Sequence, residues 1–276
     1  EDSNYLKKKL IQTIKFINNE FVCENNLFGS AYDADSEGIE GKYYIWKFDK
    51  LKNILNDKFE TFQKKYLISE KGNFEGSNIL VENIKQKFSE KDLLNINEAE
   101  KILLNERKKR IKPFFDNKVQ TDLNCYWLFS NLNSALILDD QNLFSQTIDK
   151  INIINERLNK NIFHCYDKNK NEIDVFLEDY VYYALLLISL YEINNDKISL
   201  NKCKKIMTEA WKLFFNKESK LLQKNIINSN DLFVNPTDIA DNNIPNGNSI
   251  FLLVCNKLKN ITNDKYWDNK IDILCK

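Results

Sequence analysis

The sequence predicts a mainly α-helical protein, an α/α toroid of paired helices with a few short strands. Apolar residues recur at the spacing of an α-helix over most of the 276 residues. The helical segments follow one another in pairs, as in a helical solenoid or a closed toroid. No repeat of fixed length and signature is visible, which favours the toroid.

The first half of the chain contains three helical segments. Residues 5–21 place apolar side chains at positions 10, 11, 14, 17 and 21, close to the helical repeat. Residues 48–67 predict one broken helix or two short ones, and residues 96–111 predict another. Two short strands are expected between these helices, at residues 42–46 and 77–83.

The second half is more regularly helical. Its longest apolar stretch, ALLLISLY, is shorter than the roughly 18 residues of a membrane-spanning helix and predicts a buried helix face. A further strand signal lies at residues 162–166. The predicted helices cover residues 125–138, 143–158, 177–194, 199–215, 248–261 and 265–275.

The charge balance argues against nucleic acid and membrane partners. Forty basic and 40 acidic side chains cancel, whereas both partners require a concentrated positive field. The basic run NERKKRIK, residues 105–112, is interpreted as a solvated helix end, with a phosphate site as the alternative. No signal peptide is recognised at the start of the sequence.

The six cysteines predict separate reduced thiols in a cytoplasmic protein. They lack a Cys-x-x-Cys pair and any short regular spacing. His164 and Cys165 are neighbours, but adjacent residues rarely point at one ion, so no metal site is expected. No cofactor is expected either.

The stretch AYDADSEGIEGKYYIW, residues 31–46, allows three interpretations. Asp33, Asp35 and Glu37 alternate as in a calcium loop, but Tyr44 stands where a bidentate acid is needed. Two carboxylates two residues apart could instead divide acid and base roles. The third interpretation is a glycine-punctuated turn in which the acids cap backbone amides, and it is favoured over the calcium loop.

Four further motifs share their order and spacing with a known family. They are residues 71–80, 110–127, 177–192 and 244–254. Together with residues 31–46 they resemble the YyaL-type, spermatogenesis-associated thioredoxin-domain family. This resemblance implies a thioredoxin-like domain followed by an α/α toroid related to six-hairpin glycosidases and sugar epimerases. The chain, residues 1–276, then corresponds to an incomplete toroid domain without the thioredoxin-like domain.

The chain departs from the family pattern at four positions. The pattern has a second acid at Asn117, a tryptophan at Leu123, a glycine at Cys125 and a serine at Asn246. Loss of an acid together with an aromatic surface for a sugar ring would weaken an ancestral sugar site.

The resemblance and the expected funnel of a toroid suggest a set of site residues. Glu178 and Asp179 open a long apolar helix, although acids in a first turn are also favoured by capping and by the helix dipole. Tyrosines at helical spacing are commonly core, and Asn248 is predicted to act as an N-cap together with Ser249. The predicted catalytic acids are Asp33, Asp35, Asp116 and Asp179, and the predicted substrate-binding residues are Tyr32, Asn73, Glu75, Lys118, Asn124, Glu178, Tyr180 and Asn248.

Two functional hypotheses follow. The first is a carbohydrate-binding or carbohydrate-processing toroid with a sugar ligand, and the second is a non-catalytic scaffold for a thioredoxin-like domain of the full-length protein. A glycosidase needs two carboxylates roughly 5–10 Å apart, and the predicted acids could supply them. His164 is the only histidine and lies outside every motif, which disfavours histidine-dependent sugar epimerisation. Convergence of several acids and tyrosines in one hollow would favour the first hypothesis.

Overall fold

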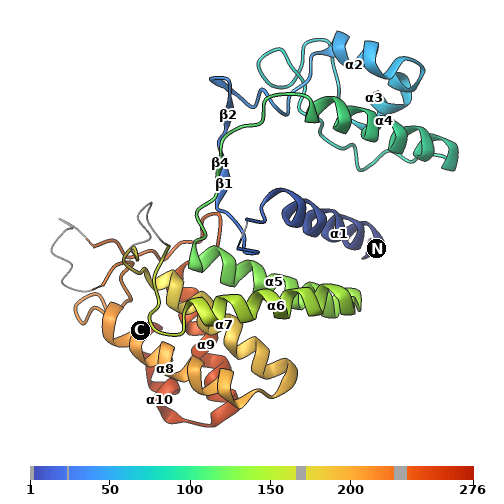
Figure 1. Cartoon of the computed structure of the whole chain (residues 1–276). Coiled ribbons are helices and arrows are strands. Elements are labelled where there is room, and N and C mark those ends of the chain that lie inside the picture. The colour runs from blue at the N-terminus through green and yellow to red at the C-terminus, as the bar shows by residue number, and fades with distance from the viewer. Residues whose placement is uncertain (1–2, 24, 166–171, 227–234) are drawn as a thin grey trace. The chain divides into compact units, whose positions relative to one another are not determined.

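The computed structural model confirms a mainly α-helical fold with a few two-residue strands (Figure 1). The chain divides into two compact units. One, here called the hairpin unit, combines residues 1–30 with residues 117–276, and the other, the inserted unit, spans residues 31–116. The structure describes residues 3–23, 25–165, 172–226 and 235–276.

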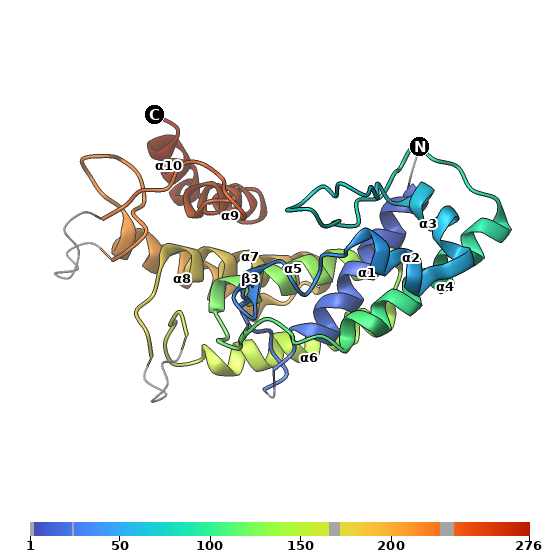
Figure 2. The same cartoon turned by 90° about the horizontal axis from the view of Figure 1, so that it is seen from above.

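The hairpin unit contains three successive helical hairpins, α5 with α6, α7 with α8, and α9 with α10 (Figure 2). Helix α7 also packs against α5 and α9, so these three helices form an inner layer and their partners an outer one. The pairing of successive helices that the sequence predicts is therefore confirmed. The helices are α1 (Ser3–Glu20), α5 (Thr121–Leu138), α6 (Gln141–Arg157), α7 (Leu177–Asn194), α8 (Lys197–Phe214), α9 (Gly247–Thr262) and α10 (Lys265–Leu274).

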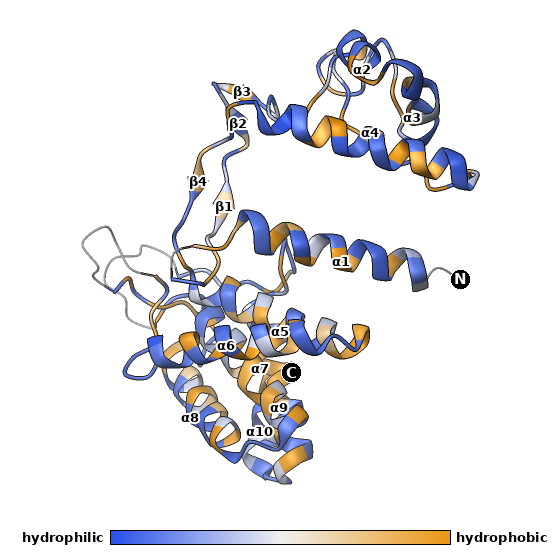
Figure 3. Ribbon diagram, turned by 45° about the vertical axis from the view of Figure 1, so that its right-hand side comes forward, coloured by the Kyte–Doolittle hydropathy of each residue, from blue (hydrophilic) through white to orange (hydrophobic). Residues whose placement is uncertain are grey.

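Helix α7 forms the centre of the hairpin unit. Thirteen of its 18 residues are buried, and its colour in Figure 3 is that of an apolar helix over much of its length. A helix that is apolar on all sides must be covered on all sides, which α5, α8 and α9 achieve here. The continuous apolar run that the sequence analysis assigned to a buried helix face is therefore confirmed.

In each hairpin, the turn between the two helices consists of an Asp or Asn followed by an Asp. The inner helix ends at Asp139, Asn195 or Asn263, and each of these residues adopts a left-handed conformation with φ between 52° and 56°. Asn and Asp tolerate this conformation better than other residues with a Cβ atom. The next residue is an aspartate whose carboxylate caps the outer helix, and these caps are Asp140, Asp196 and Asp264.

The inserted unit has its own small core. Helix α4 packs on α2 and α3 through Leu51, Leu55, Phe62, Ala99 and Leu103, all buried. Strands β1 and β4, the two ends of this unit, pair antiparallel, and β2 and β3 form a separate hairpin. Its elements are β1 (Ala31–Tyr32), β2 (Asp35–Ser36), β3 (Ile39–Glu40), α2 (Phe48–Leu55), the 3₁₀ turn η1 (Asn56–Lys58), α3 (Phe59–Lys65), α4 (Glu90–Lys108) and β4 (Phe115–Asp116).

Helix and strand boundaries differ from prediction mainly in the inserted unit. Helix α4 begins at Glu90, before the predicted residue 96, because Ser89 and Asp92 form a capping box. Residues 42–44 form a turn in place of the predicted strand, and only Trp46 pairs there, with Asn78. The predicted strand at residues 77–83 is likewise reduced to isolated bridges.

Further sequence predictions concern the loop before α7, the cysteines and membrane helices. Residues 162–165 form no strand, and Tyr166 lies outside the described residues. All six cysteines are free thiols, as predicted. Within the described ranges, none of the helices combines the length and apolar character needed to cross a membrane.

The capping aspartates predict a measurable stability cost. Asp196→Ala removes the carboxylate that accepts hydrogen bonds from Ile198 N and Ser199 N at the start of α8. We expect the free energy of unfolding to fall by about 1 kcal/mol, measured by urea denaturation followed by circular dichroism. Lys197→Ala, at the next and exposed position, should change it by less than about 0.5 kcal/mol. Equal losses in the two variants would contradict the capping role.

Candidate functional site

The inner helices α5, α7 and α9 begin around one hollow of about 450 Å³. First-turn residues of α5 and α7, Asp122 and Glu178, lie in its wall, together with the N-cap of α9, Asn246. His164 and Lys224 line it from the loops before α7 and after α8. Because unpaired N–H groups at helix amino ends carry partial positive charge, this end of the unit favours acidic side chains.

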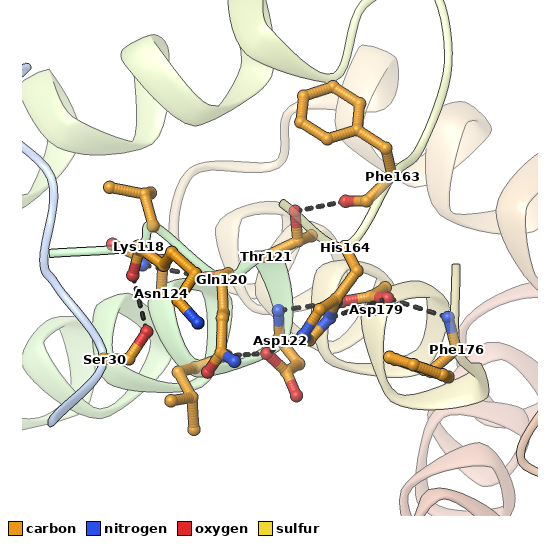
Figure 4. A network of polar contacts seen from close by, with 12 residues as sticks. Ser30, Lys118, Gln120, Thr121, Asp122, Asn124, Phe163, His164, Phe176 and Asp179 are labelled. Carbon is orange, nitrogen blue, oxygen red and sulfur yellow. Dashed lines mark hydrogen bonds and ion pairs between the residues drawn. The ribbon is translucent and has the colours of Figure 1, made fainter. Parts of the chain in front are cut away.

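A buried carboxylate, Asp179, organises the wall of this hollow (Figure 4). Its side chain is 0% exposed and accepts hydrogen bonds from Phe176 N at 2.8 Å and Asp122 N at 3.2 Å. It also contacts His164 Nδ1 at 3.0 Å. Asp179 therefore joins the first turns of α5 and α7 to the segment that carries His164.

Hydrogen bonds to the backbone also hold the segment that carries His164. Thr121 N donates to His164 O at 2.9 Å, and Thr121 Oγ1 donates to Phe163 O at 2.6 Å. Since a carboxylate only accepts hydrogen bonds, the contact with Asp179 places a proton on Nδ1 of the imidazole. The other ring nitrogen, Nε2, is then available for a second partner.

The pKa values of three groups at the hollow are raised. Burial, followed by the charge of Asp179, raises the pKa of Asp122, and burial raises that of Glu178. Burial alone would lower the pKa of His164, but the hydrogen bond and charge of Asp179, helped by Asp122 and Glu178, outweigh it and raise the pKa. The arrangement can therefore hold protons at higher pH than the same groups could in water.

Glu178 packs against Gly247, the first residue of α9, where any side chain would displace it. A Cβ atom at Gly247 would approach Glu178 Oε1 to 3.0 Å and Leu177 Cδ2 to 2.7 Å, so glycine at the start of α9 leaves room for both. Glu178 Oε2 is buried and accepts no hydrogen bond within the described part of the chain.

The structure distributes the predicted site residues of the hairpin unit among different roles. Glu178 lines the hollow, and Asp179 lies buried beneath it, so the two neighbours diverge as expected. Tyr180 faces a different hollow, where its hydroxyl contacts Glu209 Oε1 at 3.2 Å. The Lys118 side chain is exposed.

Two predicted binding residues, Asn124 and Asn248, make structural hydrogen bonds. Asn124 Oδ1 accepts from Phe28 N, and its Nδ2 donates to Phe28 O, both at 2.9 Å. Asn248 makes the same pair of bonds with the backbone of Leu222, at 2.9 Å each. The N-cap role expected for Asn248 and Ser249 belongs to Asn246, whose Oδ1 accepts from Ser249 N.

The acid-rich stretch that allowed three interpretations is a tight hairpin in the inserted unit. Glu37 and Gly38 adopt positive φ between β2 and β3, and Asp33 Oδ1 accepts from Asp35 N at 3.1 Å. Asn73 caps a neighbouring loop through two bonds to the backbone of Ile79. The site roles assigned to this unit stay predictions, and they concern Tyr32, Asp33, Asp35, Asn73, Glu75 and Asp116.

Among the residues that line the hollow, only Glu178 was a predicted site residue, and the two partners of Asp179, Asp122 and His164, were not predicted. Asp122 occupies the second position of α5, as Glu178 does in α7, so their equivalent helix positions were a usable signal. His164 carried only the signal of being the single histidine. Its partnership with Asp179, 15 residues away, became visible only in three dimensions.

Comparisons with known proteins leave the family open. No family model and no curated protein matches the chain. A solved structure of the α-1,6-mannanase GH76A from Salegentibacter sp. HEL1_6 is 15% identical, covers 80% of this chain and 68% of its own, and has a TM-score of 0.43. An inactive variant of that enzyme in complex with α-1,6-mannotriose is also 15% identical, covering 96% and 68%, with a TM-score of 0.42.

These TM-scores are too low to carry an inference. The fold description therefore rests on the packing of α5 to α10, and the resemblance to the thioredoxin-domain family stays a prediction.

The role of Asn124 can be tested by stability. Asn124→Ala leaves the buried N–H and C=O of Phe28 without partners, so we expect the free energy of unfolding to fall by about 2–3 kcal/mol in chemical denaturation. Asn133→Ala removes an exposed asparagine of the same helix and should cost less than about 0.5 kcal/mol. A ligand-binding defect without loss of stability in Asn124→Ala would contradict the structural role.

The pKa of His164 can be measured directly because the chain has one histidine. We expect its imidazole to titrate above 6.5 in NMR spectra. Asp179→Asn should lower that pKa, because burial lowers it and the negative charge that counteracts burial is removed. The ring of a folded Asp179→Asn protein titrating as in the wild type would contradict the pairing.

The same pairing predicts how stability depends on pH. A histidine whose pKa is raised on folding stabilises the protein fully below about pH 6.5, and this contribution is lost as the pH rises through the folded pKa. The melting temperature should therefore fall over this interval in the wild type and fall less in His164→Gln. Identical pH profiles would show that the pKa is not raised.

Proposed function

We propose that the hollow at the amino ends of α5, α7 and α9 binds a carbohydrate and processes it by acid–base chemistry. The observation that carries this proposal is the convergence of Asp122, His164 and Glu178, all with raised pKa, on one hollow. Enzymes that transfer protons near neutral pH require groups adjusted in this way.

The other lining groups suit a polyhydroxylated ligand. Gln120, Asn242 and Asn243 provide amide donors and acceptors, and Lys224 and Asp238 add charged ones. The ring of Phe176 offers an apolar face of the kind that packs against a sugar ring. A volume of about 450 Å³ lies within the usual range for small-ligand sites.

Separate roles for the two carboxyl groups follow from their surroundings. Glu178 is the proton donor, because burial keeps its carboxyl group protonated to higher pH. Burial and Asp179 raise the pKa of Asp122, but Asp122 Oδ1 lies 4.0 Å from His164 Nδ1, and a protonated imidazole acts in the opposite direction. This contact is the reason for giving the ionised role to Asp122. One protonated and one ionised carboxyl group are the requirement for cleaving a glycosidic bond, and Asp179 acts as a positioning residue for His164 and Asp122.

Binding is tested first, by thermal shift against mono- and oligosaccharides. A ligand that binds only the folded state stabilises it by about 2.7 kcal/mol at a hundredfold excess over Kd. We expect a sugar-specific rise in melting temperature, and release of reducing ends if a glycoside is cleaved. Glu178→Gln should lower the cleavage rate by about 10²–10⁴-fold while retaining binding.

A matched control separates site chemistry from general effects of charge. Glu156→Gln removes an exposed carboxylate of the same unit, on α6, outside the hollow, and should behave as the wild type. Absence of any sugar-specific shift in a well-folded sample would favour the scaffold hypothesis. Equal activity in Glu178→Gln and the wild type would contradict the acid role.

A further inference from the structure

Another hollow, of about 600 Å³, lies wholly within the inserted unit. It lies where the acid-rich hairpin approaches the basic run at the end of α4, and Ser36 Oγ donates to Ile111 O at 2.6 Å between these two segments. The hollow therefore brings together two sequence motifs that the carbohydrate proposal does not use. Its basic lining residues are Lys42, Lys47, Lys50, Lys109 and Arg110.

Arg110 supplies a positive charge that is fixed in position. Its Nη1 donates to Tyr43 O and Ile45 O, each at 2.8 Å, and its guanidinium carbon lies 3.8 Å from the centre of the Trp46 ring. Carbonyl groups accept from Nη1 without neutralising the charge, and no carboxylate pairs with Arg110 in the described ranges. Burial, and to a smaller extent the nearby Arg107, lower the pKa of Arg110.

Two lysines of the rim add to this excess charge. Lys47 Nζ donates only to a carbonyl, Gly76 O, at 3.0 Å, and neither Lys47 nor Lys50 forms an ion pair with the residues that the structure describes. Lys42 is paired with Glu37 at 2.9 Å, and Lys109 is paired with Glu106. The remaining lining carboxylate, Glu75, offsets one of the three unneutralised cations.

The rest of the lining is apolar and partly open to solvent. Ile39 is 47% exposed and Ile111 is 63% exposed, while Ile45 is half-buried and Tyr43 is buried between them. Exposed isoleucines beside unneutralised cations lose contact with water only when a partner covers them. The complementary partner has a negative group on an apolar body.

We propose that this hollow binds a small molecule that carries one carboxylate or phosphate on an apolar body. The anion would contact Lys47, Lys50 and Arg110, and the apolar part would cover Ile39 and Ile111. The small excess of charge is insufficient for a polyanion such as nucleic acid, whose affinity depends on many phosphate contacts. A volume of about 600 Å³ suits a ligand of small-molecule size.

Isothermal titration calorimetry on the full chain tests the proposal with four probes: phenyl phosphate, phenylacetate, benzyl alcohol and inorganic phosphate. At least one aromatic anion should bind at least about tenfold more tightly than benzyl alcohol and inorganic phosphate, because only it satisfies the cations and the apolar surface together. The two anions distinguish a phosphate from a carboxylate ligand. No binding by either anion, or equal binding of benzyl alcohol, would overturn the proposal.

Two charge reversals on the same helix provide the matched comparison. Lys50→Glu places a negative charge on the rim and should weaken binding of the preferred anion about tenfold. Lys52→Glu makes the same change in net charge at an exposed position of α2 that does not line the hollow, and should alter the affinity less than about twofold. Equal weakening by both would show a general charge effect and overturn the site. Both positions are exposed, so circular dichroism should show the same fold in each variant.

Discussion

The hairpin unit depends on the compensation of one buried charge, the carboxylate of Asp179. A carboxylate removed from water is tolerated only where hydrogen-bond donors or a cation replace its hydration. Here the donors come from the backbone at Phe176 and Asp122 and from the imidazole of His164. These contacts fix the relative positions of two inner helices and a loop. Burial raises the pKa of Asp122 and the charge of Asp179 adds to this effect, whereas the hydrogen bond and charge of Asp179 raise the pKa of His164 against the effect of burial.

The helical framework explains why these groups meet. Helix α7 is apolar on all sides, so its neighbours α5, α8 and α9 must enclose it. The left-handed turns with their capping aspartates make the connection from each inner helix to its outer helix short, so that the two helices of a hairpin pack against each other. Polar first-turn residues such as Asp122 and Glu178 then gather at one end, while apolar residues farther along the helices form the core.

The inserted unit has a smaller core, formed by α2, α3 and α4. Its strands are only two residues long, and Arg110 holds a turn by donating to the carbonyl groups of residues 42, 43 and 45 while its guanidinium lies over Trp46. A guanidinium can do this because it presents several donors in one plane and an apolar face above that plane. Because Arg110 donates to carbonyl groups and not to a carboxylate, its positive charge is not neutralised.

The sequence by itself determined the helices, their pairing and the burial of α7, because these depend on local periodicity and on apolar length. It also marked Glu178 and Asp179, whose place at the start of an apolar helix is a local signal. Only the tertiary structure decided that Asp122 and His164 belong with them, since Asp122 lies 57 residues from its partner Asp179. It also decided that Asn124 and Asn248 hold backbone segments, and that residues 42–44 turn where alternation predicted a strand. In each case a long-range hydrogen bond or a positive φ outweighed the local pattern, and neither can be read from periodicity.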